Sequence, residues 1–555
     1  MAGDKVIHVL DYGAGNLLSL LNAIRVLGYE PKVITSPDEL KIVKKIVFPG
    51  VGAFGSAMAF LRTHGYVEPL REFLRTEGNE YMGICIGMQV LFESSEESPG
   101  VEGLGVVKGS IGRFTCKDAS VPNIGWSGIS PKKPSRLWFD GWDPASRVYF
   151  VHSYRALPTS DNAEWIASKT VYGGEEYISA VQKGSVMAVQ FHPEKSGPLG
   201  LKLLSGFLDG RKDNGPIPDS TLPAAPLSRR IVACLDVRTN DDGDLVVTKG
   251  DSYDVREAPD ASGNKRGRVR NLGKPVELAK RYYEEGADEV TFLNITSFRS
   301  EPLEDAPLLQ VLEEASKTVF VPLTIGGGIR DYTDTQGRKY SSLNVADRYF
   351  RAGADKISIG SDAVLAAEKI AHGKGEPDGT TSIEQISHAY GAQAVVISVD
   401  PRRVYLDTEQ QIEEAKKQGH TVIEVNDLRD GCKPGSRCKV WYQCTIKGGR
   451  EGRDLDAIEL ARCCERLGAG EILLNSIDCD GQKKGFDLDL VRAVCSAVTL
   501  PVIASSGAGS EQHFVDVFKG TRAEAALAAG IFHRNEVPLP SVKKVVKAAG
   551  LEVRS

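Results

Sequence analysis

A cysteine flanked by glycines is the residue of this sequence with the clearest nucleophilic character. Cys85 follows the apolar run Tyr81-Met-Gly-Ile84 and precedes Ile-Gly-Met-Gln89, a pattern that predicts a strand, a sharp turn and a helix start. Glycines on both sides permit a tight turn that exposes the thiol, and a helix N-terminus favours thiolate over thiol. The alternative is a buried structural cysteine, which is common for a single Cys.

A histidine and a glutamate at short spacing favour the catalytic role for Cys85. His192 and Glu194 lie two residues apart just after the strand candidate 186–191, so their side chains point the same way in an extended segment. His192 would accept the thiol proton and Glu194 would orient the imidazole, as in covalent acyl transfer. These three residues therefore predict a nucleophile, its base and the group that orients the base.

The segment Pro49-Gly-Val-Gly52 supplies candidates for stabilising an oxyanion. It follows the strand candidate 46–48, and its glycines leave the backbone flexible. The backbone amides of Val51 and Gly52 would donate to the negative oxygen of a tetrahedral intermediate. We also hypothesise that a peptide of this segment rotates when the second half of the chain binds its ligand, which would switch on the cysteine site.

Two aspartates close equivalent strand candidates in an internal duplication. Asp236 and Asp400 each end the first strand candidate of one set, and later segments match in the same order, such as GADEVTFLNI (286–295) with GAGEILLNSI (468–477). In a barrel mouth the two carboxylates would face each other across a substrate, one protonated and one ionised. The alternative is that both aspartates cap helices in βα loops.

The strand candidates that would position these aspartates recur regularly from residue 229 onward. Helical stretches separate them, and eight βα units in about 330 residues predict a (β/α)8 TIM barrel with a half-barrel duplication. The candidates are 231–235, 289–293, 321–325, 356–359, 394–399, 471–474, 501–504 and 523–527. Insertions at 250–271 and 402–447 follow strand ends on the expected active-site face, which favours lid or wall roles; surface decoration is the alternative for the second.

Glycine-rich turns predict one phosphate site in each half of the barrel. Gly326-Gly-Gly328 and Ser506-Gly-Ala-Gly509 both lie between a strand and a helix, where bare amides can hold phosphate. Barrels often bind one phosphate after strands seven and eight, and the duplication predicts another after strands three and four. The alternative is that these glycines only make turns. The candidate contacts are Gly327, Gly328, Ser361, Asp480, Gly481, Gly507 and Gly530.

Length and composition restrict the class of protein. The 555 residues exceed what one hydrophobic core holds, so we expect an α/β domain at 1–212, a proline-rich linker at 213–227 and the barrel at 228–555. The net charge is −6 without clustered basic residues, which disfavours nucleic acid as a partner. No apolar run approaches the length of a membrane helix, so we expect no membrane partner.

The ten cysteines are scattered without a disulfide spacing, which fits a reducing, cytoplasmic setting. Cys432, Cys438 and Cys444 recur every six residues, which is not a usual zinc spacing. Surface or packed thiols are therefore the better interpretation, and we expect neither a metal nor a cofactor.

The first domain resembles the class I, triad-type glutamine amidotransferases. The resemblance covers the whole domain and rests on DYGAGN (11–16), FPGVGAFG (48–55), GICIGMQ (83–89), FVHSY (150–154) and QFHPE (190–194). It implies an α/β fold in which Cys85 forms a glutamyl thioester and ammonia leaves. It also implies that Gln89, Ser153 and Tyr154 help to hold glutamine.

The barrel resembles the cyclases of histidine biosynthesis, and the whole chain is similar to the fused, bifunctional imidazole glycerol phosphate synthases. The motifs are RRIVACLDV (229–237), LTIGGGIRD (323–331), GADKISI (353–359), SVDPR (398–402) and LLNSIDCDG (473–481). That family converts glutamine and phosphoribulosyl-formimino-aminoimidazole carboxamide ribotide (PRFAR) into glutamate, imidazole glycerol phosphate and aminoimidazole carboxamide ribotide. The resemblance implies that Asp236 and Asp400 are the acid and base, and that Lys249 helps to hold the doubly phosphorylated substrate.

Four charged residues at the starts of strand candidates are the residues that ammonia would pass on entering the barrel. A barrel would gather these starts at its bottom, where charges of mixed sign would form an ion-pair ring. Stabilisation of the bottom face is one explanation, whereas the family resemblance suggests a gate through which ammonia enters from the docked glutaminase. The residues are Arg230, Glu289, Lys356 and Glu471.

Three other functions compete with this interpretation. A pyridoxal phosphate synthase barrel would need lysine where Asp236 and Asp400 stand; a sugar-isomerising barrel would need no ammonia donor; a non-catalytic scaffold would not need intact catalytic residues. One departure from the family is Ser506, which stands where glycine is usual. We expect a monomer whose two domains contact each other and whose only other partners are small molecules.

Overall fold

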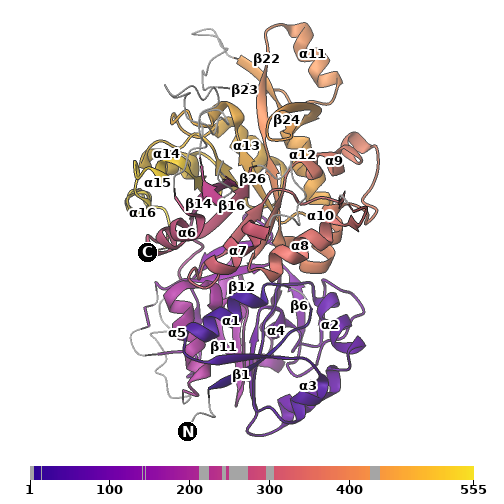
Figure 1. Cartoon of the computed structure of the whole chain (residues 1–555), viewed down its shortest axis with the longest axis vertical. Coiled ribbons are helices and arrows are strands. Elements are labelled where there is room, and N and C mark those ends of the chain that lie inside the picture. The colour runs from indigo at the N-terminus through magenta and orange to yellow at the C-terminus, as the bar shows by residue number, and fades with distance from the viewer. Residues whose placement is uncertain are drawn as a thin grey trace.

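The computed structural model shows two parts stacked along the long axis of the molecule (Figure 1). The described residues are 5–13, 15–139, 142–143, 145–211, 224–239, 245–248, 273–295, 306–334, 336–425 and 438–554. The N-terminal part, indigo to magenta, lies against one end of a barrel, and a small sheet projects beyond the other end. Among the described residues, no helix combines the length and apolar character needed to cross a bilayer.

A mixed sheet forms the centre of the N-terminal part. Its inner parallel strands are short, mostly apolar runs, because burial on both faces selects β-branched and aromatic side chains, whereas the edge strand Glu30–Ile34 is polar and partly exposed. Five of them lie in the order β2 (Glu30–Ile34), β1 (Val6–Leu10), β3 (Lys45–Phe48), β4 (Glu80–Ile84) and β13 (Val186–Val189). The strand predicted at 186–191 therefore ends two residues earlier than expected.

Further strands extend this sheet beyond β13. They are β12 (Glu175–Lys183), β11 (Ile166–Tyr172), β10 (Tyr154–Ala156), β8 (Ser130–Pro131), β6 (Ser110–Arg113) and β5 (Ser94–Ser95). A separate antiparallel pair joins β7 (Asn123–Ser127) to β9 (Val148–His152). The connecting helices are α1 (Leu17–Val26), α2 (Phe54–Thr63), α3 (Val67–Arg75), α4 (Ile86–Gln89) and α5 (Gly197–Leu208).

Eight parallel strands of the C-terminal part close into a barrel, as predicted. The ring closes because β14 (Arg230–Thr239) pairs with β16 on one side and with β28 on the other. The remaining strands follow in chain order as β16 (Glu289–Asn294), β17 (Leu323–Gly326), β20 (Lys356–Ile359), β21 (Val395–Val399), β26 (Glu471–Asn475), β27 (Val502–Ser505) and β28 (Ala525–Ala528). The short β15 (Leu245–Val247) pairs with β14 outside the ring.

Helices follow the barrel strands and begin with clear N-terminal signals. Asp456 accepts hydrogen bonds from two amides in the first turn of α12, and Thr381 and Glu384 form a capping box at α10. The helices are α6 (Pro275–Glu284), α7 (Ala306–Ala315), α8 (Ser342–Arg351), α9 (Ser361–Glu368), α10 (Ser382–Tyr390), α12 (Ala457–Arg466), α13 (Leu488–Ala497), α14 (Glu511–Gly520), α15 (Gly530–His533) and α16 (Leu539–Ala548).

The insertion predicted at 402–447 contributes most of a four-stranded antiparallel sheet. This sheet projects from the end of the barrel that faces away from the N-terminal part (Figure 1). Its elements are β22 (Pro401–Leu406), α11 (Glu409–Lys417), β23 (Ile423–Val425), β24 (Cys438–Ile446) and β25 (Glu451–Asp456). Cys444 is a buried free thiol, whereas Cys438 is disulfide-bonded, so the expectation of a thiol is wrong there. The other insertion, 250–271, lies outside the described residues.

The two parts of the chain share a continuous packed interface. Trp126 and Tyr149 belong to the same buried apolar cluster as the barrel strands and helices. Hydrogen bonds cross the interface as well: Asn16 Nδ2 donates to Gly353 O at 2.8 Å, and Trp126 Nε1 donates to Asp288 O at 3.2 Å. The N-terminal part is therefore held against the end of the barrel at which its strands begin.

Candidate active sites

Cys85 lies at the sharp turn between β4 and α4. Its φ of 51° and ψ of −102° place the backbone in a region that residues with a side chain seldom adopt, as in a nucleophile elbow. Hydrogen bonds hold the turn, because Cys85 N donates to Val189 O at 2.7 Å and Gln89 N donates to Cys85 O at 3.0 Å. Glycine permits the close packing: a Cβ at Gly87 would lie 2.1 Å from Phe48 O.

His192 and Glu194 follow β13, and their side chains are joined. Nδ1 of His192 lies 2.7 Å from Oε1 of Glu194, and both side chains are buried. Burial lowers the pKa of His192, but the charges of Glu194 and Cys85 together outweigh burial and raise this pKa to about 10. The thiol is therefore close enough to the imidazole to interact with it, so the chain does bring these three residues together.

Two glutamines connect the sulfur of Cys85 to the neighbouring strand. Gln190 Nε2 donates to Cys85 Sγ at 3.4 Å, and Gln89 Nε2 donates at 3.1 Å both to Gln190 Oε1 and to Tyr154 O. Ser153 directly precedes Tyr154 in the turn between β9 and β10. Gln190 was not singled out from the sequence, although it opens the same motif as the histidine and glutamate.

A half-buried glutamate that sequence reasoning missed interacts with Tyr154. Burial raises the pKa of Glu97 to about 7. Burial, and after it the charge of Glu97, raises the pKa of Tyr154, so the two side chains are close. Oε2 of Glu97 accepts a hydrogen bond from Phe54 N at 2.7 Å. Glu97 stands in a polar, charged run that carries no motif, so the sequence alone offers no signal for it.

The predicted oxyanion segment, Pro49–Gly52, packs against the start of α4. A Cβ at Gly50 would lie 1.6 Å from a side-chain carbon of the first residue of α4, so the packing requires glycine. The Tyr12 hydroxyl donates to the Val51 carbonyl at 2.6 Å and thereby fixes the orientation of the following peptide. Burial, and after it the charge of Cys85, raises the pKa of Tyr12, which places this tyrosine near the thiol.

The four charged residues predicted at strand starts form a closed ring at the bottom of the barrel. Lys356 Nζ lies 2.7 Å from Glu289 and 2.6 Å from Glu471. Arg230 lies 2.9 Å from Glu289 and also contacts Glu471. All four side chains are inaccessible to solvent, so each charge is satisfied within the ring.

Tyr149 connects the charged ring to the cysteine site. Its carbonyl accepts a hydrogen bond from His192 N at 2.9 Å, and its aromatic ring packs beside Trp126. Burial, and after it the charge of Glu289, raises the pKa of Tyr149, so its hydroxyl lies near the charged ring. This buried hydroxyl has no hydrogen-bond partner among the described residues. Tyr149 therefore interacts both with a residue of the cysteine site and with the charged ring.

Asp236 and Asp400 lie on opposite sides of the barrel. Their strands, β14 and β21, are four places apart in either direction around the ring. Side chains alternate between the two faces of a strand. Asp236 therefore points to the same side as Cys234, and Asp400 to the same side as Ser398, which in both strands is the barrel interior. Asp236 does not end its strand as expected, since β14 continues to Thr239.

Asp400 is half-buried, and one neighbour in particular holds its side chain. Nδ2 of Asn475, at the end of β26, donates to Oδ1 of Asp400 at 2.8 Å. Burial raises the pKa of Asp400 although hydrogen bonds from Asn475 and Ser398 oppose this effect. The charge of the nearby Asp480 raises this pKa further.

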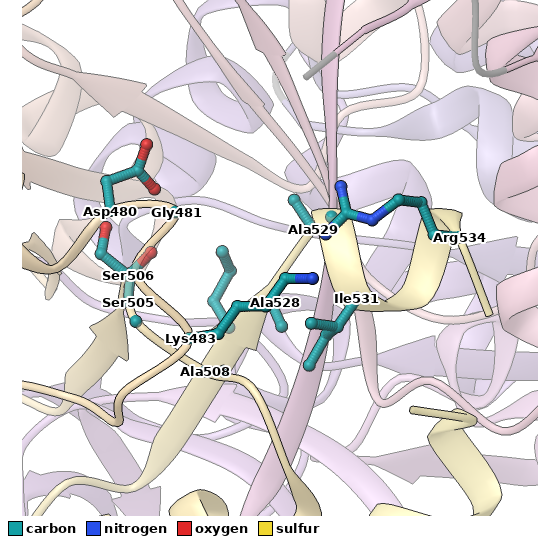
Figure 2. A pocket seen from close by; sticks show the side chains of 13 residues that line it. Asp480, Gly481, Lys483, Ser505, Ser506, Ala508, Ala528, Ala529, Ile531 and Arg534 are labelled. Atoms are coloured by element: carbon teal, nitrogen blue, oxygen red, sulfur yellow. The ribbon is translucent and has the colours of Figure 1, made fainter. Parts of the chain in front are cut away.

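A cavity of about 340 Å³ opens beyond the ends of β26, β27 and β28 (Figure 2). Ser506 adopts a φ of 73°, the left-handed conformation that glycine favours, and its side chain lines the cavity. A Cβ at Gly507 would lie 2.2 Å from Gly485 O, so the close turn requires glycine. Four predicted contacts line this one cavity: Asp480, Gly481, Gly507 and Gly530.

The predicted contacts of the other half follow two adjacent barrel strands. Gly327 and Gly328 come directly after β17 with φ of 104° and 77°, and Ser361 opens α9 after β20. Because β17 and β20 pair in parallel, these turns lie on the same face of the barrel. Lys249, the remaining candidate, lies outside the described residues.

The inserted sheet borders this same face. Thr445 Oγ1 of β24 donates to Asp400 O at 2.7 Å, and Lys447 N donates to Ser361 Oγ at 2.9 Å. Two residues of the insertion thus touch two candidate site residues, which favours a wall over a surface decoration.

Comparison with known proteins agrees with this arrangement. The family model for histidine biosynthesis proteins matches residues 230–538, and that for class-I glutamine amidotransferases matches 8–209. The imidazole glycerol phosphate synthase hisHF of Arabidopsis thaliana, named as chloroplastic, is 53% identical over 99% of this chain and 90% of its own. The hisHF synthases of Emericella nidulans and Schizosaccharomyces pombe are 51% and 49% identical over 99% of this chain and at least 98% of theirs.

The chain belongs to the fused imidazole glycerol phosphate synthases. An imidazole glycerol phosphate synthase of this kind is a bifunctional enzyme of histidine biosynthesis with glutaminase and cyclase activity. The pyridoxal phosphate synthase, the sugar isomerase and the scaffold are therefore set aside. As a member of this family the synthase takes glutamine and PRFAR as substrates.

Proposed function

We propose that Cys85, His192 and Glu194 hydrolyse glutamine through a thioester. The Cys85 thiolate attacks the side-chain amide carbon, the C–N bond breaks, and the His192 imidazolium gives its proton to the departing nitrogen as ammonia. Water then attacks the thioester, transfers a proton back through His192 and releases glutamate. The contact between His192 and Glu194, together with the strained turn at Cys85, carries this proposal.

The residues around the thiol would hold the substrate and its oxyanion. The Val51 and Gly52 amides would bind the negative oxygen once the peptide between them is suitably turned. Gln89, Ser153 and Tyr154 would bind glutamine. The half-buried carboxylate of Glu97 is opposite in charge to the α-ammonium group of an amino acid, and we add Glu97 to this set.

We propose that the charged ring is the gate through which ammonia enters the barrel. Ammonium has no lone pair, so a route that excludes water preserves the reactive neutral form. The Tyr149 hydroxyl, which has no hydrogen-bond partner among the described residues and is influenced by the charges of the ring, would offer the ammonia a polar contact. The ring of Arg230, Glu289, Lys356 and Glu471 is closed in this structure, so an ion pair has to open for passage.

In the barrel, we propose that Asp400 begins as the acid and Asp236 as the base. The raised pKa of Asp400 supports this order, because a protonated carboxyl can donate to a leaving group while the opposite carboxylate accepts a proton. One phosphate of PRFAR would occupy the cavity beside Gly481, Gly507 and Gly530, with Asp480 at its edge. The other would lie at Gly327, Gly328 and Ser361, with Lys249 as an additional contact.

Neutral variants of the two aspartates test the barrel assignment. With ammonium chloride as nitrogen donor, Asp236→Asn and Asp400→Asn should each lower the cyclase kcat by roughly 100-fold or more, as expected for loss of a general acid or base. Both variants should still hydrolyse glutamine. Asp378→Asn, at an exposed loop position, is the matched control. Normal cyclase rates in both aspartate variants would contradict the assignment.

The domain boundaries, the oligomeric state and the cellular location are also proposals. We infer domain boundaries at 1–212 and 228–555 with a linker at 213–227, and a monomer in solution. The cytoplasmic setting expected from the cysteines also stays a prediction, since the plant relative is named as chloroplastic.

A further inference from the structure

Two cationic side chains that no sequence motif identified line the cavity beyond β26, β27 and β28. Figure 2 shows Lys483 and Arg534 reaching toward the same space from opposite sides. Lys483 belongs to the turn after β26, and Arg534 follows α15, so separate segments of the barrel bring them together. They are the only lysine and arginine among the residues described as lining this cavity.

The backbone of Lys483 is fixed by the glycine-rich turn beside it. Its φ of 56° is in the left-handed region, which a lysine adopts only when its surroundings impose it. A Cβ at Gly509 would lie 2.3 Å from Lys483 O, and Gly485 N donates to Gly507 O at 2.8 Å. The two turns are thus packed directly together, so the lysine is presented from a defined position.

The guanidinium of Arg534 lies over one of the proposed phosphate contacts. A Cβ at Gly530 would lie 3.0 Å from Nη1 of Arg534. A ligand oxygen at the Gly530 backbone would therefore be within reach of the guanidinium. Planar guanidinium groups suit phosphate because they can donate two parallel hydrogen bonds.

One carboxylate holds the two cations side by side. Glu536 Oε1 accepts from Lys483 Nζ at 2.9 Å and from Arg534 Nε at 2.7 Å. Two positive charges and one negative charge leave these three side chains with a net charge of +1, and Asp480 adds a separate carboxylate to the cavity lining. Exposed ion pairs contribute little to stability, so folding alone is a weak reason to place such a cluster here.

We propose that Lys483 and Arg534 are the residues that recognise the charge of the substrate phosphate at this end of the barrel. Backbone amides of the glycine turns donate hydrogen bonds but carry no net charge, whereas a phosphate monoester carries nearly two negative charges at pH 7. The cation pair supplies that missing charge. This inference rests on the proposed phosphate site at Gly481, Gly507 and Gly530.

The test is steady-state cyclase kinetics of the full chain with PRFAR and saturating ammonium chloride, which bypasses the glutaminase. Lys483→Gln and Arg534→Gln should each raise the KM for PRFAR about tenfold, the loss expected for one charge-assisted phosphate contact, while kcat changes less than about threefold. Lys483→Arg and Arg534→Lys keep the charge and should stay within about threefold of the wild-type KM. Lys484→Gln removes a neighbouring charge that does not line the cavity and should leave KM unchanged.

The dependence of KM on ionic strength is a second test, because this dependence would not change if the two side chains had a purely structural role. Both side chains are partly exposed, 46% for Lys483 and 38% for Arg534, so their attraction for phosphate should weaken with salt. The wild-type KM should therefore rise more steeply with potassium chloride than the KM of the doubly neutral variant.

Two outcomes would overturn the inference. One is a wild-type KM in both neutral variants; the other is equal impairment of the charge-preserving and neutral variants, which would indicate a structural role. The underlying phosphate site is tested separately by Gly507→Ala, whose added methyl group collides with a backbone oxygen. A normal KM in that variant would count against the site itself, whereas a raised KM there with normal Lys483→Gln and Arg534→Gln would reject only the cation pair.

Discussion

Nζ of Lys195 lies 2.7 Å from Oδ2 of Asp355, and this buried ion pair joins the two parts of the synthase. Lys195 directly follows Glu194 of the thiol site, and Asp355 directly precedes Lys356 of the charged ring. We therefore expect a displacement of either residue to shift residues of both proposed sites. We therefore expect this ion pair to transmit the effect of ligand binding in the barrel to the rate of glutamine hydrolysis.

Removing this ion pair should weaken that coupling. In Lys195→Met, the stimulation of glutamine hydrolysis by a barrel ligand should fall roughly tenfold, within the usual range of allosteric coupling energies. The measurement is glutamate release with and without imidazole glycerol phosphate. Lys183→Met, which removes a surface ion pair to Glu164, is the matched control. Undiminished stimulation in Lys195→Met would show that the coupling takes another route.

The hydroxyl of Tyr12 is expected to hold the oxyanion segment in its resting orientation. Because this hydroxyl donates to the Val51 carbonyl, Tyr12→Phe frees the peptide that follows. Loss of one hydrogen bond, about 1 kcal/mol, should raise ligand-independent glutamine hydrolysis about fivefold. The rate in the absence of any barrel ligand is the quantity to measure. An unchanged basal rate would mean that this bond does not restrain the segment.

The pH dependence of glutamine hydrolysis should report the pair of His192 and Glu194. His192 has a raised pKa of about 10, so the imidazolium that protonates the leaving nitrogen persists below that pH and is lost as pH rises through it. Glu194→Gln removes a charge that raises this pKa, and the high-pH limb of kcat/KM should move down by about one unit or more. Glu176→Gln, a surface variant, serves as control. Coincident profiles would exclude this role for Glu194.

The stability of the protein should fall when one charge of the ring is removed without its counterpart. Lys356→Met leaves Arg230 facing two buried carboxylates, and breaking a buried ion pair in this way costs about 3–5 kcal/mol. The double variant Lys356→Met/Glu471→Gln restores neutrality and should recover much of that loss. Denaturant unfolding of both variants provides the comparison. Equal destabilisation of the single and double variants would show that packing, rather than charge balance, governs the ring.

The sequence predicted the site residues best where local chemistry alone fixes their position. Cys85 between glycines predicted the sharp turn, and the short spacing of His192 and Glu194 predicted that their side chains meet, because nearby strand ends place them; their catalytic roles stay predictions. The duplicated strands placed Asp236 and Asp400 on opposite sides, although β14 proved longer than its apolar run.

The features that the sequence did not predict depend on contacts between distant segments. Gln190 reaches Cys85 from more than a hundred residues away, and Tyr12 reaches Val51 from the loop that follows β1. Glu97 has no motif because only its burial makes it unusual. The wall beside Asp400 arises from the antiparallel pairing of β22 with β24, strands separated in the chain by α11 and β23, which hydrophobic periodicity does not reveal.

The central claim is that ammonia released at Cys85 is consumed between Asp236 and Asp400, and one variant tests it most directly. Cys85→Ala should form no imidazole glycerol phosphate from PRFAR and glutamine, but should form it at close to the wild-type rate from PRFAR and ammonium chloride at pH 8.5 or above. Product formation from glutamine in this variant, or loss of the ammonium-dependent reaction in a folded sample, would contradict the account.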